Sequence, residues 1–218
     1  MACRLHTKLT NSLTASLQVV LIFSAAPAHA ARPFFTDDAR VVDKGHCQLE
    51  SFYKEQRAYS GSEFWFLPAC NPLGVELTIG GNRVEGERSA IVQAKRLFKE
   101  LQTNGTGLAG SVGFFGSDPY VNGIASFSFL DDRAVVHTNL GTISRTGPTW
   151  GVGLEALLAP PRVYGILETF GQRSQTPTLH YGLRFWVVPN RFQIDATRGE
   201  QSADPEKRFF SVGLRLLF

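Results

Sequence analysis

Residues 208–218 read RFFSVGLRLLF, and this stretch decides the fold class. Successive side chains of a β-strand point to opposite faces, so every second residue shares a face. One face of this stretch carries Phe210, Val212, Leu214, Leu216 and Phe218. The other face is mostly small or polar and includes Gly213 and Arg215. The stretch is therefore predicted to be a strand with one apolar side.

The same alternation recurs throughout the chain upstream of residue 208. About twelve segments show it, near 46–56, 63–70, 75–84, 89–98, 106–115, 123–130, 134–144, 149–158, 163–170, 178–188, 192–198 and 208–218. The weakest is 89–98, because Ile91, Ala94 and Leu97 would also fit one face of a helix. We expect an all-β, up-and-down antiparallel transmembrane β-barrel of about twelve strands, with ten strands as the alternative count.

The connections between these segments divide into two sets that alternate along the chain. The short set is 71–74, 103–105, 131–133, 159–162 and 189–191, and it is rich in the turn residues Pro, Gly, Asn and Asp. The other set is mostly longer, at 57–62, 86–88, 116–122, 145–148, 171–177 and 199–207. Outer-membrane barrels have short periplasmic turns and longer outer loops. The alternation places the N-terminus, the short turns and Phe218 at the periplasmic rim.

A soluble β-sandwich or a lipocalin-like barrel is the alternative architecture. Periodicity alone does not distinguish the inside from the outside of a barrel, because a soluble barrel alternates as well. The faces opposite the apolar ones carry charged residues and many glycines, as Glu155 and Arg184 illustrate. Such faces are too polar for a solvent-free core, which favours a membrane barrel with a polar lumen.

The first thirty residues have the pattern of a secretory signal peptide. Arg4 and Lys8 precede an apolar stretch at 13–26, and Ala28-His29-Ala30 offers small residues at the cleavage positions. We expect cleavage after Ala30, with a membrane anchor as the alternative. The expected organisation is a signal peptide at 1–30, an N-terminal periplasmic segment at 31–45 and a transmembrane β-barrel at 46–218.

Composition narrows the function classes. The formal net charge is +3 and the charged fraction 19%, which gives no sign of nucleic-acid binding. No apolar stretch of about 20 residues follows the N-terminal segment, which excludes a helical membrane protein. No phosphate loop, zinc spacing or dinucleotide fingerprint is present, so we expect no cofactor and no metal site.

Cys47 and Cys70 are expected to form a disulfide. Pairing them centres a hairpin in the connection at 57–62, so they would face each other across adjacent antiparallel strands. An exported protein meets an oxidising compartment, which favours the bond. Two buried thiols are the alternative.

Parity assigns a set of polar side chains to the lumen. They are Glu50, Lys54, Glu76, Lys95, His137, Asn139, Glu155, Glu168, Arg184, Asp195 and Arg215. Charges of mixed sign in a low-dielectric interior must be paired and hydrogen-bonded. They would form either an ion-pair network that fills a narrow barrel or a selectivity ladder along a pore.

Aromatic residues lie near the ends of many of the predicted strands, among them Phe52, Trp65, Tyr120 and Trp150. Some are expected to form the interfacial girdles of a membrane barrel. The alternative is a mouth that binds sugars or arenes.

The last strand resembles the C-terminal signature of bacterial outer-membrane barrels. That signature is a final Phe with alternating apolar residues, here Phe210, Leu214, Leu216 and Phe218, and the resemblance implies recognition by the barrel assembly machinery. It also implies the bacterial outer membrane as the location, with its lipid and lipopolysaccharide as partners.

A narrower resemblance covers most of the expected mature chain. The chain looks like the transporter-like outer-membrane barrels that include proteins labelled as belonging to the MetA pathway of phenol degradation. The matching stretches are PFFTDDA at 33–39, VHTNLG at 136–141, LETFG at 167–171, YGLRFWVVP at 181–189, QIDAT at 193–197 and VGLRLLF at 212–218. The resemblance implies a channel for small, in particular aromatic or hydrophobic, molecules.

Three functions follow as hypotheses. The first is a passive channel or uptake protein for small molecules. The second is a structural barrel with a plugged lumen and no transport. The third is a lipid hydrolase, which is disfavoured because His137 and Thr138 are adjacent on one strand and so point to opposite faces.

Overall fold

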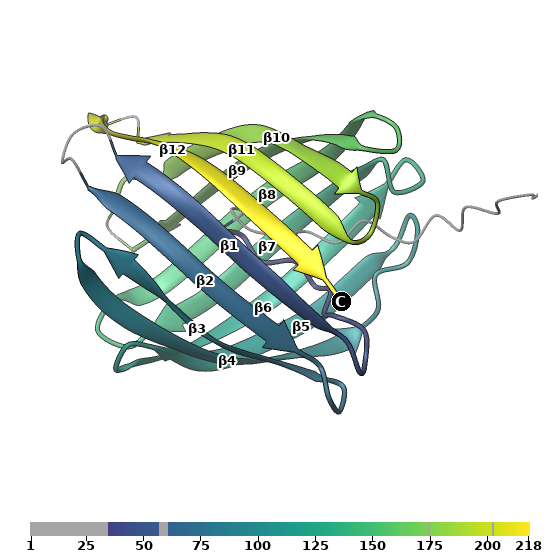
Figure 1. Ribbon diagram of the computed structural model, residues 1–218, viewed down its shortest axis with the longest axis horizontal. Helices are drawn as coiled ribbons and strands as arrows, with labels where there is room; N and C mark the ends of the chain where they lie inside the picture. The colour runs from purple at the N-terminus through teal and green to yellow at the C-terminus, as the bar shows by residue number, and fades with distance from the viewer. Residues whose placement is uncertain (1–34, 57–60, 174, 202) are drawn as a thin grey trace, which may run out of the picture.

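The computed structural model describes residues 35–56, 61–173, 175–201 and 203–218. Within these residues, twelve strands form one closed barrel (Figure 1). The strands are β1 (Cys47–Gln56), β2 (Ser62–Cys70), β3 (Val75–Val84), β4 (Glu87–Lys99), β5 (Thr106–Phe115), β6 (Asp118–Phe129), β7 (Ala134–Ile143), β8 (Gly147–Ala159), β9 (Val163–Gln172), β10 (Thr178–Val188), β11 (Phe192–Gln201) and β12 (Asp204–Leu217). The expected signal peptide and its cleavage site lie outside the described residues.

Each strand pairs antiparallel with its neighbours in the chain, and β12 closes the barrel against β1. The closing ladder runs from Gln48 opposite Leu217 to Gln56 opposite Phe209. Closure leaves no sheet edge with unpaired backbone groups. The all-β fold class and the count of twelve are therefore confirmed, and 89–98 lies within a strand rather than a helix.

The expected difference in loop length between the two rims is wrong. Two of the connections that were expected to be long span only residues 116–117 and 144–146. They are short because β6 and β8 begin before the apolar alternation that marked these strands in the sequence. They are no longer than 130–133 or 160–162 on the opposite rim. We call the rim with Cys47 and Phe218 the terminal rim and the opposite one the distal rim.

The barrel has an apolar outside and a polar inside. Outward side chains such as Ile79, Leu140 and Leu183 are more than half exposed, whereas inward His137 and Arg184 are fully buried. A soluble barrel has the reverse distribution, so this is the pattern of a barrel that faces lipid. None of the described residues belongs to a helix long and apolar enough to cross a membrane.

The Cys47–Cys70 disulfide is present, which confirms the prediction. The two cysteines are the first partners of the β1–β2 ladder, beside the backbone pairing of Cys47 with Phe218. The bond therefore ties the two strands of the first hairpin together at the terminal rim, next to the closing strand.

Replacing Cys47 and Cys70 with serine is expected to lower the free energy of unfolding by about 3 kcal/mol, because the unfolded chain gains the freedom of an open loop. Urea unfolding of the refolded barrel, followed by tryptophan fluorescence, measures the change. A reduced wild-type protein should match the double variant, and an equally stable variant would contradict a stabilising role for the bond.

Leu183 lies in the middle of β10 and is 53% exposed on the outer surface. Leu183→Arg should destabilise the barrel in a bilayer by about 2–4 kcal/mol, because a guanidinium would replace an apolar group at mid-membrane depth. Leu130→Arg in the β6–β7 turn is the matched control and should have little effect. Equal effects in vesicle-refolding titrations would count against a lipid-facing wall.

Candidate functional site

We call residues 35–46 the inner segment, because its residues 35–42 lie inside the barrel rather than beside it. Its first described residues are held by Glu168 of β9. The backbone N–H groups of Phe35 and Thr36 donate to the Glu168 carboxylate at 2.9 and 2.8 Å. Asp37 exchanges two hydrogen bonds with the Asn139 side chain of β7, each 2.7 Å long. The inner segment is therefore hydrogen-bonded to the barrel wall through side chains of the strands.

The middle of the inner segment is held by charge and packing. Lys95 of β4 donates to Asp37 at 2.8 Å and lies 3.5 Å from a carboxylate oxygen of Asp38. Burial disfavours ionisation of Asp38, but Lys95 and Arg40 hold the pKa of that carboxyl well below its usual range. The Ala39 N–H donates to Ser126 at 2.9 Å. The inner segment thus carries buried charges that are compensated from the wall.

The end of the inner segment is fixed at the terminal rim. Val42 donates its N–H to Glu76 of β3 at 2.7 Å, and its carbonyl accepts a 2.6 Å hydrogen bond from Asn71. The Gly45 N–H donates to the Asn71 carbonyl at 2.7 Å. We expected residues 31–45 to form a periplasmic segment. Of its described part, residues 35–42 lie in the lumen, and the exposed residues 43–45 lie at the terminal rim. The physical reason is that inward side chains supply hydrogen-bond partners for its backbone.

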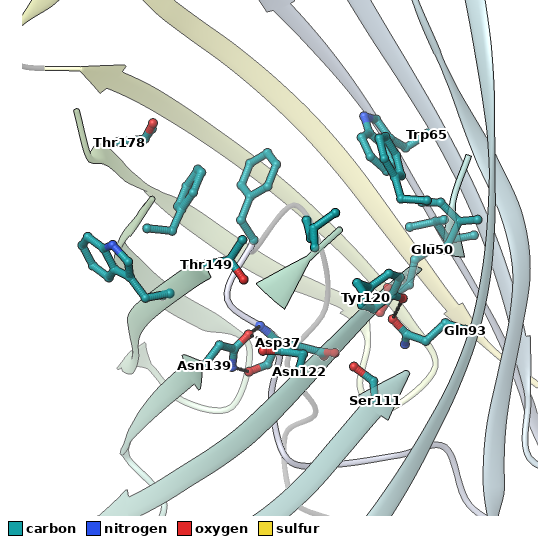
Figure 2. Close-up of a pocket in the computed structure, with 18 of the residues that line it drawn as sticks. Asp37, Glu50, Trp65, Gln93, Ser111, Tyr120, Asn122, Asn139, Thr149 and Thr178 are labelled. Atoms are coloured by element: carbon teal, nitrogen blue, oxygen red, sulfur yellow. Dashed lines mark hydrogen bonds between the residues drawn. The ribbon is translucent and has the colours of Figure 1, made fainter. Parts of the chain in front are cut away.

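A cavity of about 550 Å³ lies in the lumen next to the inner segment (Figure 2). Towards the distal rim it is lined by Ile143, Gln172 and Gln201, which lie at strand ends. On the opposite side it reaches Gln48 and Glu76, near the terminal ends of their strands. The cavity has the size of a small-molecule site and runs deep along one side of the barrel.

Figure 2 shows Asp37, Asn122 and Asn139 grouped together, with Trp65 and Thr178 on different sides of the cavity. Asn122 donates to Asn139 at 3.3 Å, and the Tyr120 hydroxyl donates to Gln93 at 2.6 Å. The polar groups on this part of the wall therefore hydrogen-bond to one another and to the inner segment.

Aromatic rings in the lumen form two groups, and Trp65, Phe115, Phe35 and Phe170 among them line the cavity. Phe52, Trp65 and Phe115 stack in a row, with ring centroids 5.3 and 6.0 Å apart. Phe35 of the inner segment stacks on Phe170 at 4.5 Å. Phe52 and Trp186 point inward with 3% and 2% exposure, so these two aromatic residues do not join an interfacial girdle.

The structure divides the polar residues expected in the lumen into two groups. All of them point inward, but only six line the cavity: Glu50, Lys54, Glu76, Lys95, Asn139 and Arg215. The remaining five are His137, Glu155, Glu168, Arg184 and Asp195, each at most 2% exposed. Parity identified the inner face, but it could not say which side chains reach open space.

The buried group contains an ion cluster. Arg184 bridges Asp195, at 2.9 Å, and Glu155, while Gln193 donates to Asp195 at 2.9 Å. These side chains come from β8, β10 and β11 and fill the lumen on that side. For Arg184, Glu155 and Asp195, the geometry is that of an ion-pair network rather than a ladder along open space.

The cations on the inner strand faces have carboxylate partners. Lys54 pairs with Glu63 at 2.8 Å, Lys95 with Asp37, and Arg215 with Glu50 at 3.7 Å. In the described residues, Nε and Nη1 of Arg40 on the inner segment have no hydrogen-bond partner, although Arg40 lines the cavity. Both nitrogen atoms are buried, and the positive charge of Arg40 stabilises the Asp38 carboxylate.

A relay of polar side chains that the sequence reasoning missed runs across four strands. His180 Nδ1 lies 2.6 Å from Glu168, His180 Nε2 lies 2.7 Å from the Thr197 hydroxyl, and that hydroxyl lies 3.2 Å from the Ser211 hydroxyl. His180 shares the inward parity of Arg184, so the sequence held the signal. The hydroxyls are at most 2% exposed and do not line the cavity, so the relay serves to orient Glu168 beneath the inner segment.

No group of three or more His, Cys, Asp or Glu side chains in the described part of the chain is arranged to hold a metal ion.

The position of the inner segment in the lumen was not predicted from the sequence. Its signal was the apolar and acidic run PFFTDDA at 33–39, which was used only as a resemblance.

A family model described as "Uncharacterised conserved protein UCP029691" matches residues 18–218. The chain belongs to that family. No curated protein matches the chain. Membership of the family named for the phenol-degradation pathway is not among these findings.

Solved structures resemble the fold at low sequence identity. A KdgM porin "in complex with disordered oligogalacturonate" is 13% identical with a TM-score of 0.61, covering 78% of this chain and 98% of its own. The NanC porin is 7% identical with a TM-score of 0.60, at the same coverages. The outer membrane protein Omp33 of Acinetobacter baumannii is 7% identical with a TM-score of 0.54, covering 79% and 98%. At these identities the likeness shows the fold alone.

Glu168→Ala is expected to release the start of the inner segment, because the Phe35 and Thr36 N–H groups lose a charged acceptor. Amide hydrogen exchange at these two residues should accelerate roughly tenfold to 100-fold. Glu200→Ala is the control, because Glu200 is only partly buried and pairs with Arg198. Unchanged exchange at Phe35, with protected strand amides, would show that Glu168 is not the anchor.

Proposed function

We propose that the protein is a passive channel for small molecules in the bacterial outer membrane. The single observation that carries the proposal is the cavity of about 550 Å³, which begins at the distal rim and continues beside the inner segment. The lipid-facing outer surface and the fold shared with porins support a membrane location. In this function the inner segment narrows the route, and solutes pass along β1–β4.

The proposed orientation places the terminal rim at the periplasm. The signal-peptide pattern at 1–30 supports export, and the final strand supports insertion by the barrel assembly machinery through Phe210, Leu214, Leu216 and Phe218. Outer-membrane lipid and lipopolysaccharide are then the partners of the outer surface. The distal rim opens to the exterior, so solutes enter the cavity from outside.

We propose uncharged, ring-bearing molecules as the solutes. The rings of Trp65 and Phe115 line the cavity and give it an aromatic wall. A channel for an acidic sugar such as oligogalacturonate, with which the KdgM porin forms a complex, would need cations free to meet carboxylates. Here Lys54, Lys95 and Arg215 already face carboxylates of this chain. The resemblance to barrels labelled for phenol degradation supports the same class.

A structural barrel with a plugged lumen is the second candidate. The observation that favours it is the extent of the inner segment, whose hydrogen bonds reach β3, β4, β6, β7 and β9. The buried cluster around Arg184 adds to the filling of the lumen. A lipid hydrolase has less support, because the hydroxyls next to His180 are buried away from the cavity.

Single-channel recording in planar bilayers separates these candidates. The mature protein should give small, discrete conductance steps, and a variant lacking residues 31–40 should give a several-fold larger conductance because the inner segment no longer narrows the lumen. The deletion leaves Val42, Asn71 and the disulfide in place. An absence of steps in both proteins, at any voltage, would refute the channel and leave the structural barrel.

A further inference from the structure

We propose that the cavity contains a binding subsite for one aromatic ring, and that Phe35 occupies this subsite until a solute displaces it. The subsite, which we call the Phe35 cage, is formed by Phe52, Phe170, His180 and Phe209. This inference rests on the proposed function in one respect, because a solute reaches the cage only if it can enter the channel. The binding event can be tested separately.

The geometry of the cage fits a single ring. Phe35 lies stacked on Phe170, with centroids 4.5 Å apart and an interplanar angle of 25°. Phe52, His180 and Phe209 meet the same ring edge-on, at 6.2, 5.6 and 6.3 Å and angles of 73–75°. Aromatic pairs favour these offset-stacked and edge-to-face arrangements. A free arene would find the same contacts.

The cage belongs to the barrel, whereas its occupant does not. Phe52, Phe170, His180 and Phe209 are on β1, β9, β10 and β12, and His180 is held by Glu168 and Thr197. Phe35 is on the inner segment, which has no strand pairing. A displacement of Phe35 therefore leaves the cage walls in place.

The cage is accessible from the cavity. Phe35, Phe170 and Phe209 all line it, and Phe35 is only partly buried, whereas Thr36, Asp38 and Ala39 are buried behind it. The anchors at Asp37, Ala39 and Val42 lie further along the inner segment. Release of Phe35 thus requires the loss of the contacts of one ring and of the hydrogen bonds from the Phe35 and Thr36 N–H groups to Glu168, and the deeper anchors remain.

The surroundings select an uncharged arene. The Glu168 carboxylate lies against the Phe35 N–H and would repel an anion. The Lys54 ammonium lies 5.8 Å from the Phe35 ring centroid and 4.5 Å from that of Phe209, where it favours an aromatic face by cation–π attraction. Glu63 already balances its charge. The ligand class is therefore a small, neutral molecule with one aromatic ring.

Benzyl alcohol is a suitable probe, and its saturated analogue cyclohexylmethanol is the matched comparison. Binding to the refolded mature protein is followed by saturation-transfer NMR, and displacement is followed by hydrogen exchange at the Phe35 and Thr36 amides. Benzyl alcohol should accelerate that exchange saturably, and cyclohexylmethanol should not. This readout is specific to the cage, because partitioning into detergent does not reach these amides.

Phe35→Ala should bind benzyl alcohol about tenfold more tightly than the wild type, because no internal ring competes. Phe35→Tyr keeps the ring and should retain wild-type affinity. Phe209→Ala removes a wall and should weaken binding. Phe98→Ala is the control, because Phe98 is 69% exposed on the outer surface of β4. Heat-dependent gel mobility reports that each variant is folded.

The inference is overturned if Phe35→Ala binds benzyl alcohol no more tightly than the wild type, or if both alcohols accelerate exchange equally. The Phe35 variants suffice for this conclusion if Phe209→Ala does not fold. Tighter binding by Phe35→Ala without any conductance would support the cage and refute the channel. Conductance with unchanged affinity would support the channel and refute the cage.

Discussion

Closure of the sheet is the constraint on which the rest of this structure depends. A strand in contact with lipid must hydrogen-bond all of its backbone groups within the protein, because the hydrocarbon offers no partner. The pairing of β1 with β12 meets this requirement from Gln48 to Gln56. At one end of this seam, Cys47 pairs through its backbone with Phe218, and the disulfide ties Cys47 to Cys70 of β2. Once the sheet is closed, strand parity alone divides side chains between lipid and lumen.

A polar lumen then creates a second requirement, because buried charges must find partners. Arg184 of β10 finds them in Asp195 on the adjacent β11 and in Glu155 on β8, two strands away. Lys95 finds Asp37 and Asp38 on the inner segment. Glu76 and Glu168 accept hydrogen bonds from backbone N–H groups of the inner segment. The inner segment therefore completes the electrostatics of the wall. It also determines how much of the lumen remains open as a cavity.

Local patterns predicted the wall well and the lumen poorly. Alternation placed Glu155 and Arg184 on the inner face, and the hairpin register paired Cys47 with Cys70. Loop lengths were wrong at 116–117 and 144–146, because the polar starts of β6 and β8 extend beyond the apolar alternation that marked them. Such residues pair through their backbones, so their side chains carry little signal. The inner segment was missed because its sequence has neither the two-residue period of a strand nor the 3.6-residue period of a helix.

The sequence by itself determined the twelve strands, their inward and outward faces and the register of the first hairpin. These features depend on a period of two and on contacts between consecutive strands. Only the tertiary structure decided that Phe35 lies against Phe170, that Glu168 holds its N–H, and where open space remains. Phe35 and Glu168 are 133 residues apart in the chain. A periodic pattern specifies the face of a side chain, but only the closed barrel specifies what it meets across the lumen.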